Sequence, residues 1–290
     1  MPHPLTRITP TLWVAQSRLY AMNSGLWVSA GAACLIDPGI HVDELDRLVQ
    51  AIATQGVQVT ALVLTHSHWD HILGPERFPG VPVVAQAGYR AALREAAPRT
   101  RRVIADMEAA QGRTRAKPFA MPQPDQTFMQ TTTLPVGDLR LRLTHAPGHA
   151  ADQLTVYDPA SGTLWAADML SDQEIPFVSH SLPAYRATLA TLAGWDIQTL
   201  VPGHGAPTGD PATIAARLGE DRAYLDELAG RISMVVTQGG SLAAAVAACA
   251  EIHLRHPAAN AEPHRFNIES AYAELGGAAD PAQVGWSQEA

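Results

Sequence analysis

The chain has 290 residues, of which 47% are hydrophobic and 17% charged, a composition that excludes disorder and a length that suffices for one catalytic domain with an appended segment. Its formal net charge of −8, without any stripe rich in Lys or Arg, argues against nucleic acid as the main partner. No apolar run is long enough to span a membrane, and residues 1–7 lack the apolar core of a secretory signal, so we expect a cytoplasmic protein without a membrane partner.

The N-terminal part is predicted to alternate short strands with one helix. Residues 11–36 predict three strands that end at the turn signal Asp37-Pro38-Gly39. Residues 42–54 place their aliphatic side chains on one helical face, and residues 59–65 predict a buried strand. Cys34 lies in one of these strands, and we expect it to be a buried small residue rather than half of a disulfide.

The six residues after the strand at 59–65 carry the strongest functional signal. They form the sequence HxHxDH: His66, Ser67, His68, Trp69, Asp70 and His71. Because side chains alternate along an extended segment, His66 and His68 face the same way and can share one metal ion. If the backbone curls after Trp69, Asp70 and His71 can bind a second ion. Imidazole and carboxylate without thiolate favour Zn²⁺, with Mn²⁺ or Fe²⁺ as alternatives. The competing interpretation is a solvated loop with incidental histidines.

The chain between this motif and residue 126 is longer than a minimal fold needs. A strand is predicted near 81–85, followed by a helical insertion at about 87–115. The insertion is interpreted as two helices, the first over 89–97. Prolines at 118, 122 and 124 then predict a loop that borders the pocket.

Three further candidate ligands follow strand-like runs in the region 126–204. They are His149 in Ala146-Pro147-Gly148-His149, Asp168 in Ala166-Ala167-Asp168, and His204 in Pro202-Gly203-His204-Gly205. Glycine beside each histidine allows a tight turn that brings the ring to an ion. Two ions need about seven or eight protein ligands, and the downstream residues supply those that the first motif lacks.

In this order, HxHxDH, APGH, AAD and PGHG resemble the motifs of the metallo-β-lactamase superfamily of hydrolases, over roughly residues 10–206. The resemblance implies an α/β fold, a four-layer αββα sandwich with the metals at one edge. It also implies a ligand set in which His66, His68 and His149 bind the first metal, Asp70, His71 and His204 bind the second, and Asp168 bridges the two. The PGHG motif and the bridging aspartate are more similar to the glyoxalase II and lactonase branches than to true β-lactamases.

After His204 the pattern becomes helical, so we predict a catalytic domain at 1–206 and a helical C-terminal segment at 207–290. Helices are expected at 210–232, 240–256 and 266–275. In the glyoxalase II branch a helical C-terminal segment covers the active site; a cap over the site and a homodimer surface both remain open here. His264, Arg265 and Asn267 are either substrate contacts, Arg265 by pairing with a carboxylate, or the polar start of a helix.

The predicted function is hydrolysis of an ester, thioester or lactone carbonyl in a small molecule, by a hydroxide that bridges two Zn²⁺ ions. Asp70 is expected to orient the water and pass its proton to the leaving group, in addition to its role as a ligand. Since Lys117 is the single lysine, glutathione carboxylates would have to pair with arginines.

Alternatives of the same fold are a β-lactamase, a phosphoester hydrolase and a mono-iron oxidoreductase resembling persulfide dioxygenases. A binding module with structural zinc is a further alternative, although structural sites are usually rich in thiolate.

Overall fold

The computed structural model describes residues 5–110, 112 and 119–277. Its strands form two sheets, one with seven strands in the order β1-β2-β3-β4-β5-β6-β7 and one with five in the order β12-β11-β10-β9-β8. The strands of the first sheet are β1 (Thr6–Arg7), β2 (Leu12–Gln16), β3 (Asn23–Ser29), β4 (Ala32–Ile36), β5 (Gln58–Val63), β6 (Val83–Gln86) and β7 (Gln126–Phe128). Those of the second are β8 (Thr131–Val136), β9 (Leu139–His145), β10 (Leu154–Asp158), β11 (Thr163–Trp165) and β12 (Thr199–Val201).

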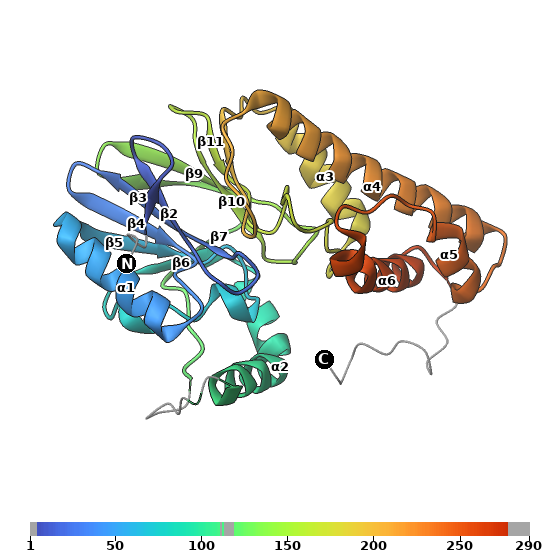
Figure 1. Ribbon diagram of the computed structural model, residues 1–290, viewed down its shortest axis with the longest axis horizontal. Helices are drawn as coiled ribbons and strands as arrows, with labels where there is room; N and C mark the ends of the chain where they lie inside the picture. Colours follow the sequence, from blue (N-terminus) through green and yellow to red (C-terminus); the bar gives the residue numbers. More distant parts are fainter. Residues whose placement is uncertain (1–4, 111, 113–118, 278–290) are drawn as a thin grey trace.

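The two sheets pack face to face with helices on the outside (Figure 1). Trp27 and Val63 from the first sheet meet Leu143 and Trp165 from the second in the central core, where burial of apolar surface stabilises the sandwich. The helices are α1 (Val42–Gln55), α2 (Tyr89–Ala110), α3 (Leu182–Leu192), α4 (Pro211–Thr237), α5 (Leu242–Cys249) and α6 (Pro257–Glu274). This arrangement confirms the predicted αββα sandwich and its C-terminal helices.

Two other apolar clusters attach the helices to the sheets. Leu48 and Ile52 of α1, together with Leu93 of α2, pack against the outer face of the seven-stranded sheet. Leu189 of α3 and Leu228 of α4 belong to the cluster on the side of the five-stranded sheet. The predicted helix at 42–54 is confirmed as α1, which ends at Gly56 in the left-handed conformation (φ 66°) that glycine adopts without strain.

Four helix predictions are wrong in their boundaries, and the first of these, the helix predicted at 210–232, extends to Thr237 as α4. The described part of the insertion is one helix, α2, which continues through Pro98 because Leu93, Thr100 and Ile104 keep one buried face across it. The helix predicted at 240–256 ends at Cys249 as α5. The helix predicted at 266–275 begins earlier, at Pro257, where the fixed φ of proline suits a first helical turn.

Several predictions fall on residues outside the described part of the chain. These are residues 1–4, the last residues of the insertion (111 and 113–115), Lys117 and Pro118 of the proline-marked loop, and residues 278–290. The domain boundary after residue 206 stays a prediction. In the described part of the chain, every helix is too short or too polar to cross a membrane.

Candidate metal centre

The predicted ligands come from loops at one edge of the sandwich. β9 and β11 both run antiparallel to β10, and β11 is parallel to β12, so the C-terminal ends of β9, β11 and β12 meet at the same edge. His149, Asp168 and His204 follow these ends. The HxHxDH motif approaches from β5 of the other sheet, and a 3₁₀ turn at Trp69–His71 provides the predicted curl of the backbone.

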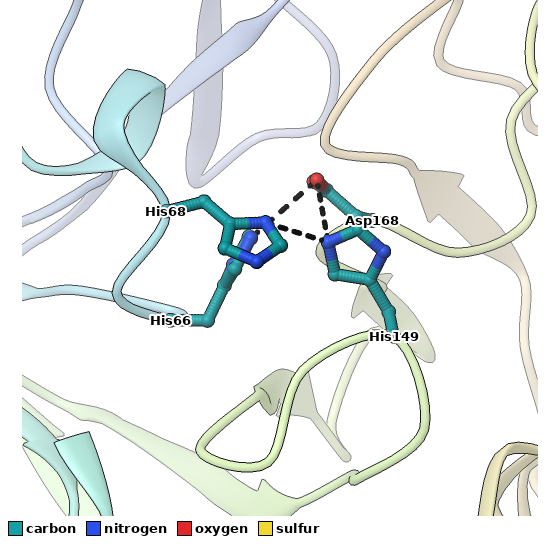
Figure 2. Close-up of side chains that lie close together, drawn as sticks. All are labelled: His66, His68, His149 and Asp168. Atoms are coloured by element: carbon teal, nitrogen blue, oxygen red, sulfur yellow. Dashed lines mark hydrogen bonds and ion pairs between the residues drawn. The ribbon is translucent and has the colours of Figure 1, made fainter. Parts of the chain in front are cut away.

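One group of four donors forms at the centre of this edge (Figure 2). His66, His68, His149 and Asp168 each offer one ligand atom, and these atoms all lie within 4.8 Å of one another. Asp168 Oδ2 is 3.5 Å from His66 Nε2 and 3.3 Å from His149 Nε2. His68 contributes its other ring nitrogen, Nδ1, which lies 3.0 Å from His149 Nε2.

A second group of three donors lies beside the first. Asp70, His71 and His204 also have ligand atoms within 4.8 Å of one another. His204 Nε2 is 3.4 Å from both His71 Nε2 and Asp70 Oδ2. Asp168 faces both groups, because its Oδ1 atom is 3.2 Å from His71 Nε2 and its Oδ2 atom is 3.5 Å from His204 Nε2. All seven predicted site residues therefore come together, and their role as ligands remains a prediction.

Asp37 fixes the orientation of one ring and was missed by the sequence reasoning. It is fully buried, and its Oδ2 atom accepts hydrogen bonds from His71 Nδ1 at 2.9 Å and Thr65 Oγ1 at 2.5 Å. Its Oδ1 atom accepts from the Thr65 backbone N–H at 2.8 Å. The available signal was the position of Asp37 directly after β4, because β4 is parallel to β5 and their C-terminal ends share an edge.

Two backbone carbonyls fix two further rings. His149 Nδ1 lies 2.9 Å from the Phe177 carbonyl oxygen, and His204 Nδ1 lies 3.0 Å from that of Tyr20. A ring that donates from Nδ1 to a carbonyl keeps its proton there and leaves the lone pair of Nε2 free. Both rings therefore direct Nε2 at the centre. His149 presents it unprotonated, whereas burial of His204 is outweighed by Asp168 and Asp70, which raise the pKa of His204 well above its ordinary value, so His204 gives up its Nε2 proton when a cation binds. Carbonyl partners carry no sequence signal, so these contacts could not be predicted.

The first-group imidazoles are neutral at physiological pH. Burial, followed by the neighbouring His71, lowers the pKa of His66 to about 4. Burial, followed by His149, lowers the pKa of His68 to about 3. Burial also lowers the pKa of His149 to about 4, although Asp168 opposes this effect. Neutral imidazole is the form that binds a metal ion.

The residues present fit a divalent cation. His66 Nε2 and Asp168 Oδ1 are buried and make no hydrogen bond to any described residue. A buried polar atom without a hydrogen bond costs about 1–3 kcal/mol. A cation bound between His66 Nε2 and Asp168 Oδ1 would remove that cost. The donors are all imidazole nitrogen or carboxylate oxygen, a set that suits Zn²⁺ and related ions.

A pocket of about 820 Å³ adjoins the two donor groups and is also lined by residues of α6. Five of the predicted site residues line it: His68, Asp70, His149, Asp168 and His204. The residues that line it away from the centre are Tyr20, Ala21, Gln173, Glu174, Ile175, Phe177, His256, Ala259, Asn260, Glu262, Pro263 and Phe266. The C-terminal helical segment thus contributes directly to the pocket.

The α6 helix holds the segment that carries Phe177. Asn267 Oδ1 accepts a hydrogen bond from the Val178 N–H at 2.8 Å, and its Nδ2 donates to the Pro176 carbonyl at 2.6 Å. Asn260 Oδ1 accepts from the Ile175 N–H at 3.1 Å. Because these bonds flank Phe177, they also fix the carbonyl that orients His149. Asn267 is also fully buried. Its role is therefore to hold this segment, and it does not contact substrate.

The other two candidate contacts on α6 also have structural partners. His264 is buried, accepts from Tyr224 Oη at 2.9 Å and donates to the Cys249 carbonyl at 3.1 Å. Arg265 pairs with Glu269 at 2.5 Å and does not line the pocket. The α6 residues at the pocket, Glu262 and Phe266 among them, were not expected there.

A sequence model of the metallo-beta-lactamase superfamily matches residues 19–204, which include every predicted site residue. The chain belongs to the metallo-beta-lactamase superfamily. The match confirms the resemblance inferred from the ordered motifs.

Individual relatives are more distant. The chain is 46% identical to a hydroxyacylglutathione hydrolase from Stenotrophomonas maltophilia (strain R551-3) over 59 residues, which are 19% of this chain and 21% of that protein. A stereoselective inverting sec-alkylsulfatase from Pseudomonas sp. has a similar structure, with a TM-score of 0.74 and 16% identity over 99% of this chain and 52% of that one. A metallo-beta-lactamase family protein from Thermus thermophilus has a TM-score of 0.68 and 19% identity over 92% of this chain and 93% of its own. Thus the chain spans about a fifth of the matched hydrolase and about half of the sulfatase, and the structural likenesses show the fold alone.

Proposed function

We propose that this superfamily member hydrolyses an ester, thioester or lactone carbonyl of a small molecule with the help of two divalent cations. The observation that carries this proposal is the convergence of seven nitrogen and oxygen donors as two groups that share Asp168. Zn²⁺ is the proposed metal, with Mn²⁺ and Fe²⁺ as alternatives. His66, His68 and His149 would hold one ion, Asp70, His71 and His204 the other, and Asp168 both.

Divalent cations held in this way lower the pKa of water from about 15.7 to near 7, so that a nucleophile is available at neutral pH, and they stabilise negative charge on the attacked oxygen. The chain contributes the fixed positions of the donors. Asp37, through His71, and Phe177, through His149, keep the imidazole rings from turning. Such fixed orientation is what makes a charged centre effective in catalysis.

Asp70 is the proposed proton acceptor. It lines the pocket, and its Oδ2 atom lies 3.4 Å from His204 Nε2. Burial raises the pKa of Asp70, but His71 and His204 more than offset this effect and hold it well below its ordinary value. The carboxylate is therefore charged at neutral pH. In this position it can orient a water molecule, accept its proton and pass the proton towards the leaving group.

Two observations favour acyl hydrolysis over the alternatives. The second donor group is complete, and a mono-iron oxidoreductase has little use for Asp70, His71 and His204. The relative named hydroxyacylglutathione hydrolase also supports cleavage of an acyl bond. A β-lactamase or phosphoester hydrolase would use the same centre and differs only in substrate.

A turnover screen tests the proposal. Zinc-loaded, manganese-loaded and chelator-stripped protein would be assayed with thioesters, lactones, aryl esters, β-lactams and phosphodiesters. We expect a metal-dependent preference for one carbonyl class. Asp70→Asn should lose this turnover. Asp226→Asn is its matched control, because Asp226 is an exposed aspartate that pairs with Arg186 away from the pocket. Metal-loaded protein without turnover on any carbonyl substrate, but with sulfur-dependent oxygen uptake, would instead support the iron oxidoreductase.

A further inference from the structure

The pocket has an aromatic and aliphatic wall beyond the metal centre. Phe177 and Phe266 stack with ring centroids 4.8 Å apart and an interplanar angle of 27°. Ile175 lies on the same segment as Phe177, and Tyr20 stands at the pocket with 60% of its surface exposed. Side chains of this kind bind a ligand mainly by removing its apolar surface from water.

The carboxyl groups of this pocket outside the centre belong to two glutamates, of which exposed Glu262 carries the charge, because burial, opposed by His204, raises the pKa of Glu174 to about 7. Glu174 and Glu262 line it, whereas no lysine or arginine does so among the described residues. Glu262 is exposed and forms no ion pair with any described residue. The carboxylate of Glu174 comes no closer than 4.0 Å to His204 Nδ1.

The two arginines that adjoin pocket residues in the sequence, Arg255 beside His256 and Arg265 beside Phe266, already have carboxylate partners. Arg255 pairs with Asp221 at 2.6 Å and with Glu220 at 3.2 Å, and its guanidinium also donates to the Glu174 carbonyl. Arg265 pairs with Glu269. Both guanidinium groups are therefore engaged, and neither lines the pocket where it could bind an anionic ligand. An anionic group held against the wall beside Phe266 and Glu262, away from the proposed cations, would lose hydration without gaining a cationic side chain.

We propose that this pocket selects substrates by their arm, meaning the part of the molecule beyond the reacting carbonyl. An arm that is apolar and either uncharged or cationic would bind, and an arm that carries a negative charge would be excluded. The identity of the reacting bond rests on the proposed function, whereas selection of the arm can be measured by binding alone. Polyanionic thioesters and phosphodiesters are then poor ligands. An acyl compound with an alkyl or aryl arm, with or without a distal ammonium group, fits the wall and the two glutamates.

Binding of unreactive ligands tests this selection without requiring catalysis. The probes are three amides with the same alkyl arm that ends in a methyl, a trimethylammonium or a sulfonate group, titrated calorimetrically into zinc-loaded protein. We expect the methyl and trimethylammonium probes to bind at least about tenfold more tightly than the sulfonate. Equal or tighter binding of the sulfonate would overturn the proposal.

Charge reversal at the pocket supplies the second arm of the test. Glu262→Arg should tighten sulfonate binding and weaken trimethylammonium binding, each about fivefold, as expected for one charge pair near the surface. Glu251→Arg makes the same change at an exposed position outside the pocket and should leave both affinities unchanged. Identical effects of the two variants would show that net charge, not the pocket, sets the preference.

The apolar wall is tested by arm length. Each methylene that contacts the wall should tighten binding about fourfold, from about 0.8 kcal/mol per buried methylene. Phe266→Ala should flatten this dependence, and an unchanged slope would remove the wall from the proposal. If the ranking of probes holds while no matching ester is cleaved, the proposed function fails and the selectivity stands. If neutral and sulfonated esters are instead cleaved at equal rates, the proposed function stands and the proposed selectivity fails.

Discussion

Replacement of Asp37 by asparagine isolates the contribution of a residue that touches neither predicted metal nor substrate. The carboxylate of Asp37 accepts three hydrogen bonds, two from Thr65 and one from His71. Asparagine has one oxygen that accepts and one nitrogen that donates, so it cannot satisfy all three donors. If the amide nitrogen faces His71, the ring must move its proton to Nε2, which removes the lone pair that points at the centre.

The size of the effect follows from the burial of these groups. Asp37 is fully buried, so each donor that loses its acceptor costs about 1–3 kcal/mol, and we expect Asp37→Asn to lower the free energy of unfolding by that amount. Loss of an outer partner of a metal-binding imidazole lowers metal affinity about 10- to 100-fold. We expect this loss at the ion held by Asp70, His71 and His204, and a smaller loss at the other ion.

Zinc titration of metal-free protein against a chelating dye measures both affinities, and urea unfolding measures stability. Asp138→Asn is the control, since Asp138 is exposed in the turn between β8 and β9, at the opposite end of β9 from the ligand loop, and its backbone N–H donates a hydrogen bond to Ser29. Unchanged affinity for both ions in a folded Asp37→Asn variant would refute the reasoning that Asp37 orients His71.

Three further predictions concern other residues. Asp70→Asn should retain bound metal by mass spectrometry and lose about 10²- to 10⁴-fold in turnover, and near-full turnover would remove Asp70 from the mechanism. Asn267→Ala should lower the free energy of unfolding by about 1–3 kcal/mol, because it leaves the backbone groups of Pro176 and Val178 without partners. A loss below about 0.5 kcal/mol in urea unfolding would contradict the role of Asn267 in holding residues 175–178. Burial raises the pKa of Asp152 from its ordinary 3.8 to about 6, with Ser67 opposing this effect in part. The folded state therefore binds this proton more tightly than the unfolded state, so the metal-free protein should lose stability relative to Asp152→Asn as pH rises from 4 to 6, by at most about 3 kcal/mol, and a pH-independent difference would show that Asp152 does not titrate in this range.

The centre could be predicted because its donors are marked locally in the sequence. His66, His68, Asp70 and His71 lie within six residues after a buried strand, and strand order then brings His149, Asp168 and His204 to the same edge. A strand-like run followed by polar residues and glycine can be recognised in the sequence without knowledge of the fold. The sequence therefore indicated both the donors and their assembly.

The features that escaped prediction depend on contacts between distant segments. Asp37 resembles an ordinary turn residue until β4 is known to lie beside β5. Asn267 is polar at what looks like a helix start, and only the packing of α6 against residues 175–178 shows its structural role. Pro98 predicted a break in α2, but the buried face formed by Leu93, Thr100 and Ile104 continues past it. In each case tertiary packing overrides a correct local preference.

The most direct test of the central claim is a zinc titration of metal-free protein in which bound metal and ester or thioester turnover are measured on the same samples. We predict that two ions bind per chain and that turnover reaches its full value only when the second has bound. Full turnover with one ion per chain, or saturation at one ion, would contradict a centre in which Asp168 is shared between two donor groups.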